Sequence, residues 1–354
     1  MKQYDALSLL SGGLDSILAA KAVARQGLSV LGLHFVSPFF GKPGSVAAWR
    51  AKYGLDIETV DVADAFVAMM AGGPANGVGK FLNPCIDCKI FMLRRAKDML
   101  EKYGARFLVT GEVIGQRPMS QRIDALNIIS RDAGVRSILL RPLSAKRLPP
   151  SPMEESGLVR REELYGFYGR GRREQLDLAA SFGLTDLPTP GGGCMLAELE
   201  SARRYYPIFR HKRLPSGADL HLANVGRQYW RSGLALAVGR NQSDNARLEA
   251  LASEGDLLFK VRDYPGPLGL GRRFGQTPWD EAEVRFAAAL LASYSGKAVA
   301  LGGPVEVTVG LGGARVSVAV TPCRDAPNGF AEPDWETAKQ GKRALFGDER
   351  EDDF

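Results

Sequence analysis

Apolar residues in the first 140 positions come in short runs, and helical segments separate these runs. The sequence predicts strands at residues 6–10, 29–35, 57–61, 106–110 and 137–140, and helices at 17–25 and 86–103. Gly27 and Gly104 follow the two helices, where glycine commonly ends a helix. Strands that alternate with helices are typical of an α/β fold whose parallel sheet is covered on both faces.

The pattern changes beyond residue 205. Short strands dominate there, at residues 257–262, 305–309 and 316–320, and no periodicity is visible from Arg324 onward. The chain has 354 residues, which is enough for two ordinary domains. We therefore predict a doubly wound α/β domain at 1–205, a smaller α+β domain at 206–323 and a flexible acidic tail at 324–354.

A Gly-rich turn joins the first predicted strand to the first predicted helix. It consists of Ser11-Gly12-Gly13-Leu14-Asp15-Ser16. Glycines let backbone N–H groups turn inward, the serines add hydroxyl groups and the helix N-terminus adds partial positive charge, so the turn predicts an anion site. It lacks the spacing and the lysine of a Walker loop. The carboxylate of Asp15 in such a site indicates a bound Mg²⁺ ion.

Three cysteines are spaced for sulfur or metal chemistry. Cys85 and Cys88 lie on one face at the start of the second helix, where the helix N-terminus favours a thiolate. Cys194 follows a second Gly-rich loop that would bring it close. Three thiolates hold three irons of a 4Fe–4S cluster, but they could instead carry and resolve a persulfide, or bind zinc with a fourth ligand. Cys323 receives no role.

Composition and charge narrow the class of protein. The hydrophobic fraction of 45% and the charged fraction of 24% are ordinary for a globular protein. No apolar run has membrane-spanning length and no signal peptide is visible, so we expect a cytoplasmic protein without a membrane partner. The net charge is +6 although the chain ends in an acidic run. Recurring basic pairs, such as Arg172-Arg173 and Arg203-Arg204, form a surface that attracts phosphate backbones.

The turn at 11–16 resembles the S-G-G-x-D-S signature of the PP-loop ATP pyrophosphatases, which adenylate a carbonyl oxygen and release pyrophosphate. The segment 83–88, Asn-Pro-Cys-x-x-Cys, resembles the sulfur site of tRNA 2-thiouridylases. Three further segments resemble tRNA 4-thiouridine synthetases: Thr110-Gly111-Glu112 with Gly115-Gln116, Ser120-Gln121, and Arg141-Pro142-Leu143. The resemblance covers about residues 5–200 and implies an adenine nucleotide alpha hydrolase-like fold.

The resemblance implies roles for particular residues. Those expected to bind the nucleotide are Ser11, Gly12, Gly13, Asp15, Ser16, His34, Gly111, Glu112 and Gln116. Those expected to be catalytic are Asp15, Cys85, Cys88 and Cys194, with the three cysteines as metal ligands. The implied cofactors are ATP, Mg²⁺ and a 4Fe–4S cluster. The sequence shows no rhodanese domain or N-terminal RNA-binding extension like those of the 4-thiouridine synthetases, which favours the cluster over a persulfide.

The predicted second domain resembles the small RNA-binding module of ribosome-associated quality-control factors. The resemblance lies in Val238-Gly239-Arg240-Asn241, with Asn245, and in Asp263-Tyr264-Pro265-Gly266. Side chains expected to meet phosphates are Arg227, Arg240, Arg272 and Arg273, and those expected to stack on bases are Tyr229, Trp230 and Tyr264. Alternatively, these aromatic side chains form a core and the arginines are merely solvated.

Together these features predict an ATP-dependent tRNA sulfurtransferase that forms 2- or 4-thiouridine. An amide-forming PP-loop ligase is one alternative, and it would not need Cys85. A non-catalytic RNA-binding protein is another, and it would tolerate Asp15→Ala. The sequence does not indicate the modified uridine, the sulfur donor or the oligomeric state.

Overall fold

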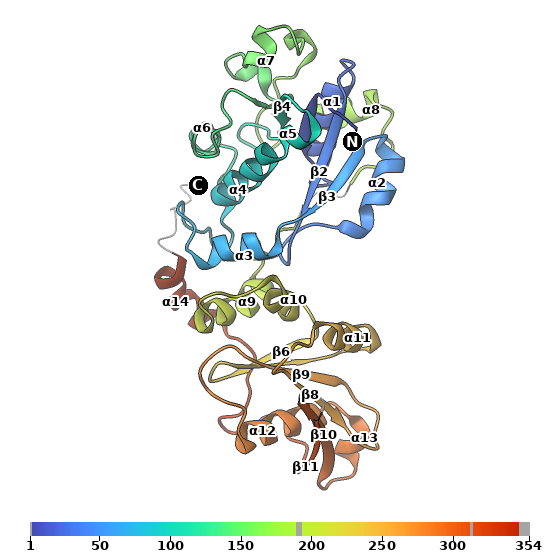
Figure 1. The fold of residues 1–354 in the computed structure, drawn as a ribbon, viewed down its shortest axis with the longest axis vertical. Helices are drawn as coiled ribbons and strands as arrows, with labels where there is room; N and C mark the ends of the chain where they lie inside the picture. The colour runs from blue at the N-terminus through green and yellow to red at the C-terminus, as the bar shows by residue number, and fades with distance from the viewer. Residues whose placement is uncertain (1, 189–192, 312–313, 347–354) are drawn as a thin grey trace. The chain divides into compact units, whose positions relative to one another are not determined.

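The first of two structural units, Met1–Ala197, is built around a five-stranded parallel sheet (Figure 1). The computed structural model describes residues 2–188, 193–311 and 314–346. The strands are β1 Ala6–Leu9, β2 Val30–Val36, β3 Asp56–Asp61, β4 Phe107–Val109 and β5 Leu139–Leu140. All four residues of β1 are buried, because a central parallel strand is covered on both faces.

Helices cover both faces of this sheet. One face packs against α1 Leu14–Ala24, α2 Val46–Tyr53 and α8 Arg173–Ser181 through a single apolar cluster. On the other face, α4 Cys85–Asp98 contacts β1, β4 and α6 Ile123–Asp132. The remaining α-helices of this unit are α3 Ala63–Ala71, α5 Leu100–Tyr103 and α7 Pro152–Glu155. The predicted doubly wound α/β fold is confirmed.

The strand order β3-β2-β1-β4-β5 creates a point where the winding reverses. From β1 the chain runs outward to β2 and β3, then returns to pair β4 with the opposite side of β1. Ligands in open α/β sheets bind at the carboxyl ends of the strands beside such a reversal. The Gly-rich turn follows β1, and Thr110-Gly111-Glu112 follows β4, so both lie at that point.

The second unit, Glu198–Leu345, contains a six-stranded antiparallel sheet in the order β11-β10-β8-β9-β7-β6. Its strands are β6 Arg227–Arg231, β7 Leu234–Val238, β8 Leu257–Val261, β9 Leu268–Arg273, β10 Val305–Leu311 and β11 Ala314–Val320. Its helices are α9 Leu199–His211, α10 Gly217–Ala223, α11 Gln242–Leu251, α12 Glu281–Ala292, α13 Gly296–Ala300 and most of α14 Trp335–Phe346. Apolar clusters join α10 and α11 to one face of the sheet, and α12 and α13 to the other.

Two features of the second unit differ from the sequence prediction or were not foreseen. Strands β6, β7 and β9 were not predicted, and β7 is apolar on both faces, so its sequence does not alternate. Helix α14 lies within the segment for which the sequence predicts an aperiodic tail. Its polar residues outnumber its apolar ones, which hides its periodicity. No helix in the described ranges combines the length and the hydropathy needed to cross a bilayer.

Candidate active site

The Gly-rich turn after β1 is shaped by one close packing contact and by its own hydroxyl groups. Gly12 has a φ of +82°, and a Cβ atom there would lie 2.2 Å from the ring of Trp49. Gly13 donates its N–H to Ser11 Oγ at 3.3 Å, and Ser16 Oγ donates to the Gly13 carbonyl at 2.7 Å. These contacts place the turn at the N-terminus of α1, where N–H groups and the helix dipole favour an anion.

The end of β4 approaches this turn so closely that only glycine fits between them. A Cβ atom on Gly111 would lie 2.5 Å from the carbonyl of Asp15 and 2.6 Å from the backbone nitrogen of Ser16. Ordinary non-bonded carbon contacts are about 3.5–4.0 Å. The segment Thr110-Gly111-Glu112 therefore lies directly against the first turn of α1, and two segments that the sequence singled out meet in one place.

Asp15 leaves part of its carboxylate without a partner. Gln116 Nε2 donates to Asp15 Oδ2 at 3.1 Å. In the part of the chain that the structure describes, the buried atoms Asp15 Oδ1, Gln116 Oε1 and Arg172 Nε have no hydrogen-bond partner. Burial raises the pKa of Asp15, although Gln116, Arg172 and Arg117 oppose this. Unpaired buried polar atoms are costly, so this cluster fits a site that a polar ligand or a cation completes.

Glu112 contacts several groups of the protein, and its Oε1 atom has no hydrogen-bond partner in the described part of the chain. It is 1% exposed. Its Oε2 accepts hydrogen bonds from Arg141 Nε at 2.8 Å and from Thr110 Oγ1 at 3.0 Å, and Lys89 Nζ lies 3.8 Å from Oε1. Burial would raise the pKa of Glu112, but Arg141 and Lys89 together hold it below its usual value. Glu112 therefore links the end of β4 to α4, and its predicted contact with the nucleotide stays a prediction.

His34 also has both of its ring nitrogens engaged. Nδ1 lies 2.8 Å from the Leu10 carbonyl, and Nε2 accepts the backbone N–H of Lys42 at 2.8 Å. This pattern requires a neutral ring with its proton on Nδ1. Burial lowers the pKa of His34, which favours the same state. His34 links the residue before the Gly-rich turn to the loop that follows β2, and a direct contact with the nucleotide stays a prediction.

The cysteine segment begins α4 and is tied to the stretch that contains Gln116. Asn83 Nδ2 lies 3.3 Å from Cys85 Sγ and 3.4 Å from Met119 Sδ. Cys85 and Cys88 are half-buried. Burial, followed by the charges of Cys194 and Cys85, raises the pKa of Cys88 well above its usual value. Burial of Cys88 therefore opposes the thiolate that the sequence analysis expects at the helix N-terminus.

Cys194 is held near α4 by backbone hydrogen bonds on its C-terminal side. Met195 donates its N–H to the Phe39 carbonyl at 2.9 Å, and the Leu196 carbonyl accepts from Leu82 at 3.0 Å. The three cysteines thus lie within electrostatic reach of one another. Over residues 2–188, 193–311 and 314–346, however, no three Cys, His, Asp or Glu side chains form a group that could hold a metal ion. The donor types suit a cluster, but their present arrangement does not.

The sequence of the first unit matches a known protein family. Residues 1–146 match the family model of ThiI, the thiamine biosynthesis protein. This match confirms the resemblance of the N-terminal part to the thiouridine synthetases.

Curated relatives of this ThiI-like segment extend the comparison. The tRNA-specific 2-thiouridylase MnmA of Nitratidesulfovibrio vulgaris is 34% identical over 30% of this chain and 34% of its own length. A probable tRNA sulfurtransferase of Natranaerobius thermophilus is 27% identical over 49% of this chain and 41% of its own length. The chain spans 29% to 41% of the length of the first curated relatives that it matches.

A solved structure also matches in part. The C-terminal part of the fibronectin/fibrinogen-binding protein of Streptococcus suis has a TM-score of 0.24 and 22% identity, over 28% of this chain and 47% of that chain. A likeness this loose supports no statement about function. The predicted RNA-binding module in the second unit therefore stays a prediction.

Several residues of the ThiI-like site were not singled out for it from the sequence. Arg117 and Arg172 influence the carboxylate of Asp15, and Lys89 approaches Glu112. Trp49 covers Gly12 and stands edge-on to His34, with ring centroids 5.0 Å apart. Arg172 belongs to a basic pair that the sequence does show. The other three carry no local signal, because their partners lie far away along the chain.

In the second unit, two predicted RNA contacts are wrong. Arg272 is 4% exposed, and its guanidinium bonds Asp256 at 2.6 Å and Asp219 at 3.3 Å, so it has no capacity left for a phosphate. Tyr229 is 5% exposed and its hydroxyl group bonds that of Tyr294, so it has no free face for a base. Both residues belong to the interior of the fold.

Other predicted contacts lie at the surface of the second unit. Arg240 forms an ion pair with Asp244 at 2.7 Å. Arg227 and Arg273 make no ion pair within the described ranges. The guanidinium of Arg227 lies 4.6 Å from the ring centre of Tyr294. These two arginines keep their charge available for a partner.

Proposed function

We propose that this protein is an ATP-dependent tRNA sulfurtransferase that adenylates a uridine carbonyl oxygen and replaces that oxygen with sulfur. One observation carries the proposal. The segment that follows β4 contacts the Gly-rich turn through Gly111 and Gln116, and contacts the cysteine segment through Glu112 and Met119. The proposed nucleotide site and the three thiols would thus share one edge of the sheet, as activation followed by sulfur transfer requires. The relatives named above are tRNA sulfurtransferases and a 2-thiouridylase.

The nucleotide would bind with its phosphates against the Gly-rich turn. Backbone N–H groups at the start of α1, with Ser11 and Ser16, would contact the pyrophosphate that leaves when the uridine oxygen attacks the α-phosphate. Asp15 Oδ1 and Gln116 Oε1 are the oxygens suited to a Mg²⁺ ion or its water ligands, since both are buried and unpaired in the described part of the chain. Mg²⁺ would supply neutralisation of the phosphate charge.

The thiols would supply the sulfur that attacks the activated carbon of the uridine. In the second step a sulfur nucleophile adds to the uridine carbon and AMP leaves with the former carbonyl oxygen. Cys85, Cys88 and Cys194 would hold or deliver that sulfur, as persulfide and resolving thiol or as ligands of a 4Fe–4S cluster. Because the thiols do not form a group that could hold a metal ion within the described residues, a cluster would need them in a different arrangement.

The second unit would contribute affinity for RNA. A cavity of about 60 Å³ lies among Arg203, Arg204, Arg227 and Gln228, with Glu332 and Pro333 also lining it. Burial, followed by the charges of Arg203 and Arg240, lowers the pKa of Arg204. Arg204 makes no ion pair within the ranges that the structure describes. A half-buried cation among other cations is stabilised by an external anion, and a phosphate of tRNA is such an anion. With tRNA as substrate and reduced thiols, the proposed reaction belongs in the cytoplasm.

The test is tRNA analysis combined with cofactor analysis. A deletion strain complemented with the wild-type gene should regain a thiolated uridine, measured by nucleoside mass spectrometry. This recovery of the thiolated uridine should be abolished by each of three variants, Asp15→Asn, Cys85→Ala and Cys194→Ala. It should be retained by Cys323→Ala. Unchanged thionucleosides in the deletion strain would overturn the proposal. Iron and sulfide in anaerobically purified protein decide between the cluster and the persulfide, and an active protein free of iron excludes only the cluster.

A further inference from the structure

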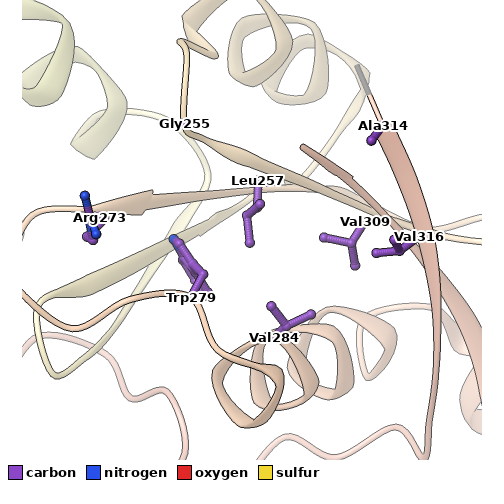
Figure 2. Close-up of a pocket in the computed structure, with 8 residues that line it drawn as sticks. All are labelled: Gly255, Leu257, Arg273, Trp279, Val284, Val309, Ala314 and Val316. Carbon is purple, nitrogen blue, oxygen red and sulfur yellow. The ribbon is translucent and has the colours of Figure 1, made fainter. Parts of the chain in front are cut away.

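The second unit contains an apolar cavity that neither the proposed reaction nor the RNA contacts above use. Its volume is about 390 Å³. Its apolar walls are Leu257 of β8, Val284 of α12, Val309 of β10 and Val316 of β11, which Figure 2 shows facing one common space. Val316 is 58% exposed, so the cavity opens to solvent on the side of β11. An open apolar cavity on a folded unit is a candidate binding site.

Trp279 forms a polar wall of this cavity. Its indole lies over Gly271, where a Cβ atom would come within 2.7 Å of the ring, and it stacks on Phe330 with an interplanar angle of 11°. These neighbours fix the ring. Its Nε1 atom is buried and has no hydrogen-bond partner in the part of the chain that the structure describes. A buried N–H without an acceptor is costly, so a ligand that brings an acceptor would relieve that cost.

Arg273 supplies a positive charge beside the indole. It is the last residue of β9, its side chain is exposed, and it makes no ion pair within the described ranges. Figure 2 shows Trp279 standing between Arg273 and Val284. The neighbouring Arg272 is buried and fully paired, so the two arginines do different things. The cavity therefore combines apolar walls, one hydrogen-bond donor and one available cation.

We propose that this cavity binds an unstacked nucleobase of RNA. The valine and leucine side chains contact the base, Trp279 Nε1 donates to an acceptor on its edge, and Arg273 meets the phosphate of the same nucleotide. A long-chain carboxylate would also pair with Arg273 and could accept from the indole N–H, and the competition experiment below distinguishes it from a base. This inference rests on the proposed function, since it takes RNA as the substrate. It adds a second base contact, separate from the uridine that reacts.

The test uses the full chain and two fluorescent hexamers with the same phosphates. One is a uridine hexanucleotide and the other has abasic sugars, and binding is followed by fluorescence anisotropy. Wild type should bind the uridine hexamer about tenfold more tightly than the abasic one, as expected for one buried base. Ala314→Phe fills the cavity mouth and should remove this preference. Ser317→Phe, on the other face of the same strand, is the matched control and should keep it.

Further variants separate the hydrogen bond from the charge. Trp279→Phe keeps an aromatic wall without the N–H and should reduce the preference, while Arg273→Gln should weaken both hexamers equally. Arg315→Gln removes a nearby exposed charge and should change neither property. Circular dichroism and Tm confirm that each variant is folded, and Ala314→Phe changes only an exposed residue. Equal affinity of wild type for both hexamers, or a preference that survives Ala314→Phe, would overturn the inference. So would competition by laurate without competition by uridine monophosphate.

The same experiment distinguishes this inference from the proposed function. Thiolation of tRNA is measured separately by nucleoside mass spectrometry. If thiolation is absent and the base preference is present, the proposed function fails and the cavity still binds a base. If thiolation is present and the base preference is absent, only the inference fails.

Discussion

At the scale of single residues, the candidate active site depends on glycines that leave space for neighbouring groups, and Gly12 also has a φ of +82°. Gly12 accommodates the ring of Trp49, and Gly111 accommodates the backbone of Asp15 and Ser16. The buried polar residues have equally specific tasks, since Glu112 and His34 use their polar atoms to hold segments together. In the described part of the chain, Asp15 Oδ1 and Gln116 Oε1 are among the buried atoms that have no hydrogen-bond partner.

The substitution Gly111→Ala tests the close approach of β4 to α1. The added methyl group would lie 2.5 Å from the Asp15 carbonyl, so the two segments must separate. We expect a loss of stability of about 1–3 kcal/mol and a fall in thiolation rate of about 100-fold, because a small displacement disrupts the alignment of reacting groups. Gly44→Ala is the control, since nothing lies within 4 Å of its added Cβ. A wild-type rate in Gly111→Ala would show that the two segments need not touch.

The substitution Glu112→Gln tests the buried ion pairs through their pH dependence. The folded-state pKa of Glu112 lies below the unfolded value of 4.5. Its ionised form therefore stabilises the fold fully above about pH 4.5, and this contribution is lost as the pH falls through the lower folded pKa. At about pH 7 the variant should lose roughly 3 kcal/mol, as expected when one partner of a buried pair is removed.

Urea unfolding at a series of pH values measures this effect. The stability difference between wild type and Glu112→Gln should shrink as the pH is lowered below about 4.5. A difference that stays constant across that range would mean that Glu112 contributes through shape rather than through charge.

At the scale of elements, the sequence predicted what local patterns encode. The Gly-rich turn, the cysteine pair and the strand ends were visible because each is a short segment beside a helix or strand. The contact of Glu112 with Lys89 and Arg141 was not, because the two partners come from α4 and from the end of β5. The buried Arg272 was read as a surface cation because strand β9 reads Leu-Gly-Leu-Gly-Arg-Arg, with little apolar alternation.

Neighbouring arginines at the end of β9 provide the test at this scale. Side chains alternate between the two faces of a strand, and here Arg272 bonds Asp219 and Asp256 while Arg273 is exposed. Arg272→Ala should therefore destabilise the protein by about 3–5 kcal/mol, because it leaves the buried carboxylate of Asp256 without a cation, while Asp219 keeps only Lys212. Arg273→Ala should change stability by less than about 0.5 kcal/mol. Denaturant unfolding of both variants measures this, and similar losses would contradict the assigned burial.

At the scale of the whole molecule, chemistry and RNA affinity are assigned to different units. The parallel sheet and the antiparallel sheet each have their own apolar clusters. All the residues proposed for adenylation and sulfur transfer lie in the first unit, Met1–Ala197, including Cys194. The apolar cavity lies in the second, Glu198–Leu345, as do Arg204, Arg227 and Arg273, which make no ion pair within the described ranges. Units with separate cores are expected to fold separately.

This division predicts what each unit does alone. A fragment of residues 1–197 should bind ATP as tightly as the full chain, because every proposed nucleotide contact is retained. Its KM for tRNA should rise at least about tenfold, and its tRNA affinity should depend less steeply on salt, because the phosphate contacts of the second unit are gone. The matched fragment, 198–345, should bind tRNA with most of the salt dependence of the full chain and should not bind ATP. Suppose instead that fragment 1–197 keeps the KM and the salt dependence of the full chain. The first unit would then bind tRNA by itself, and the arginines around the small cavity would bind a different partner.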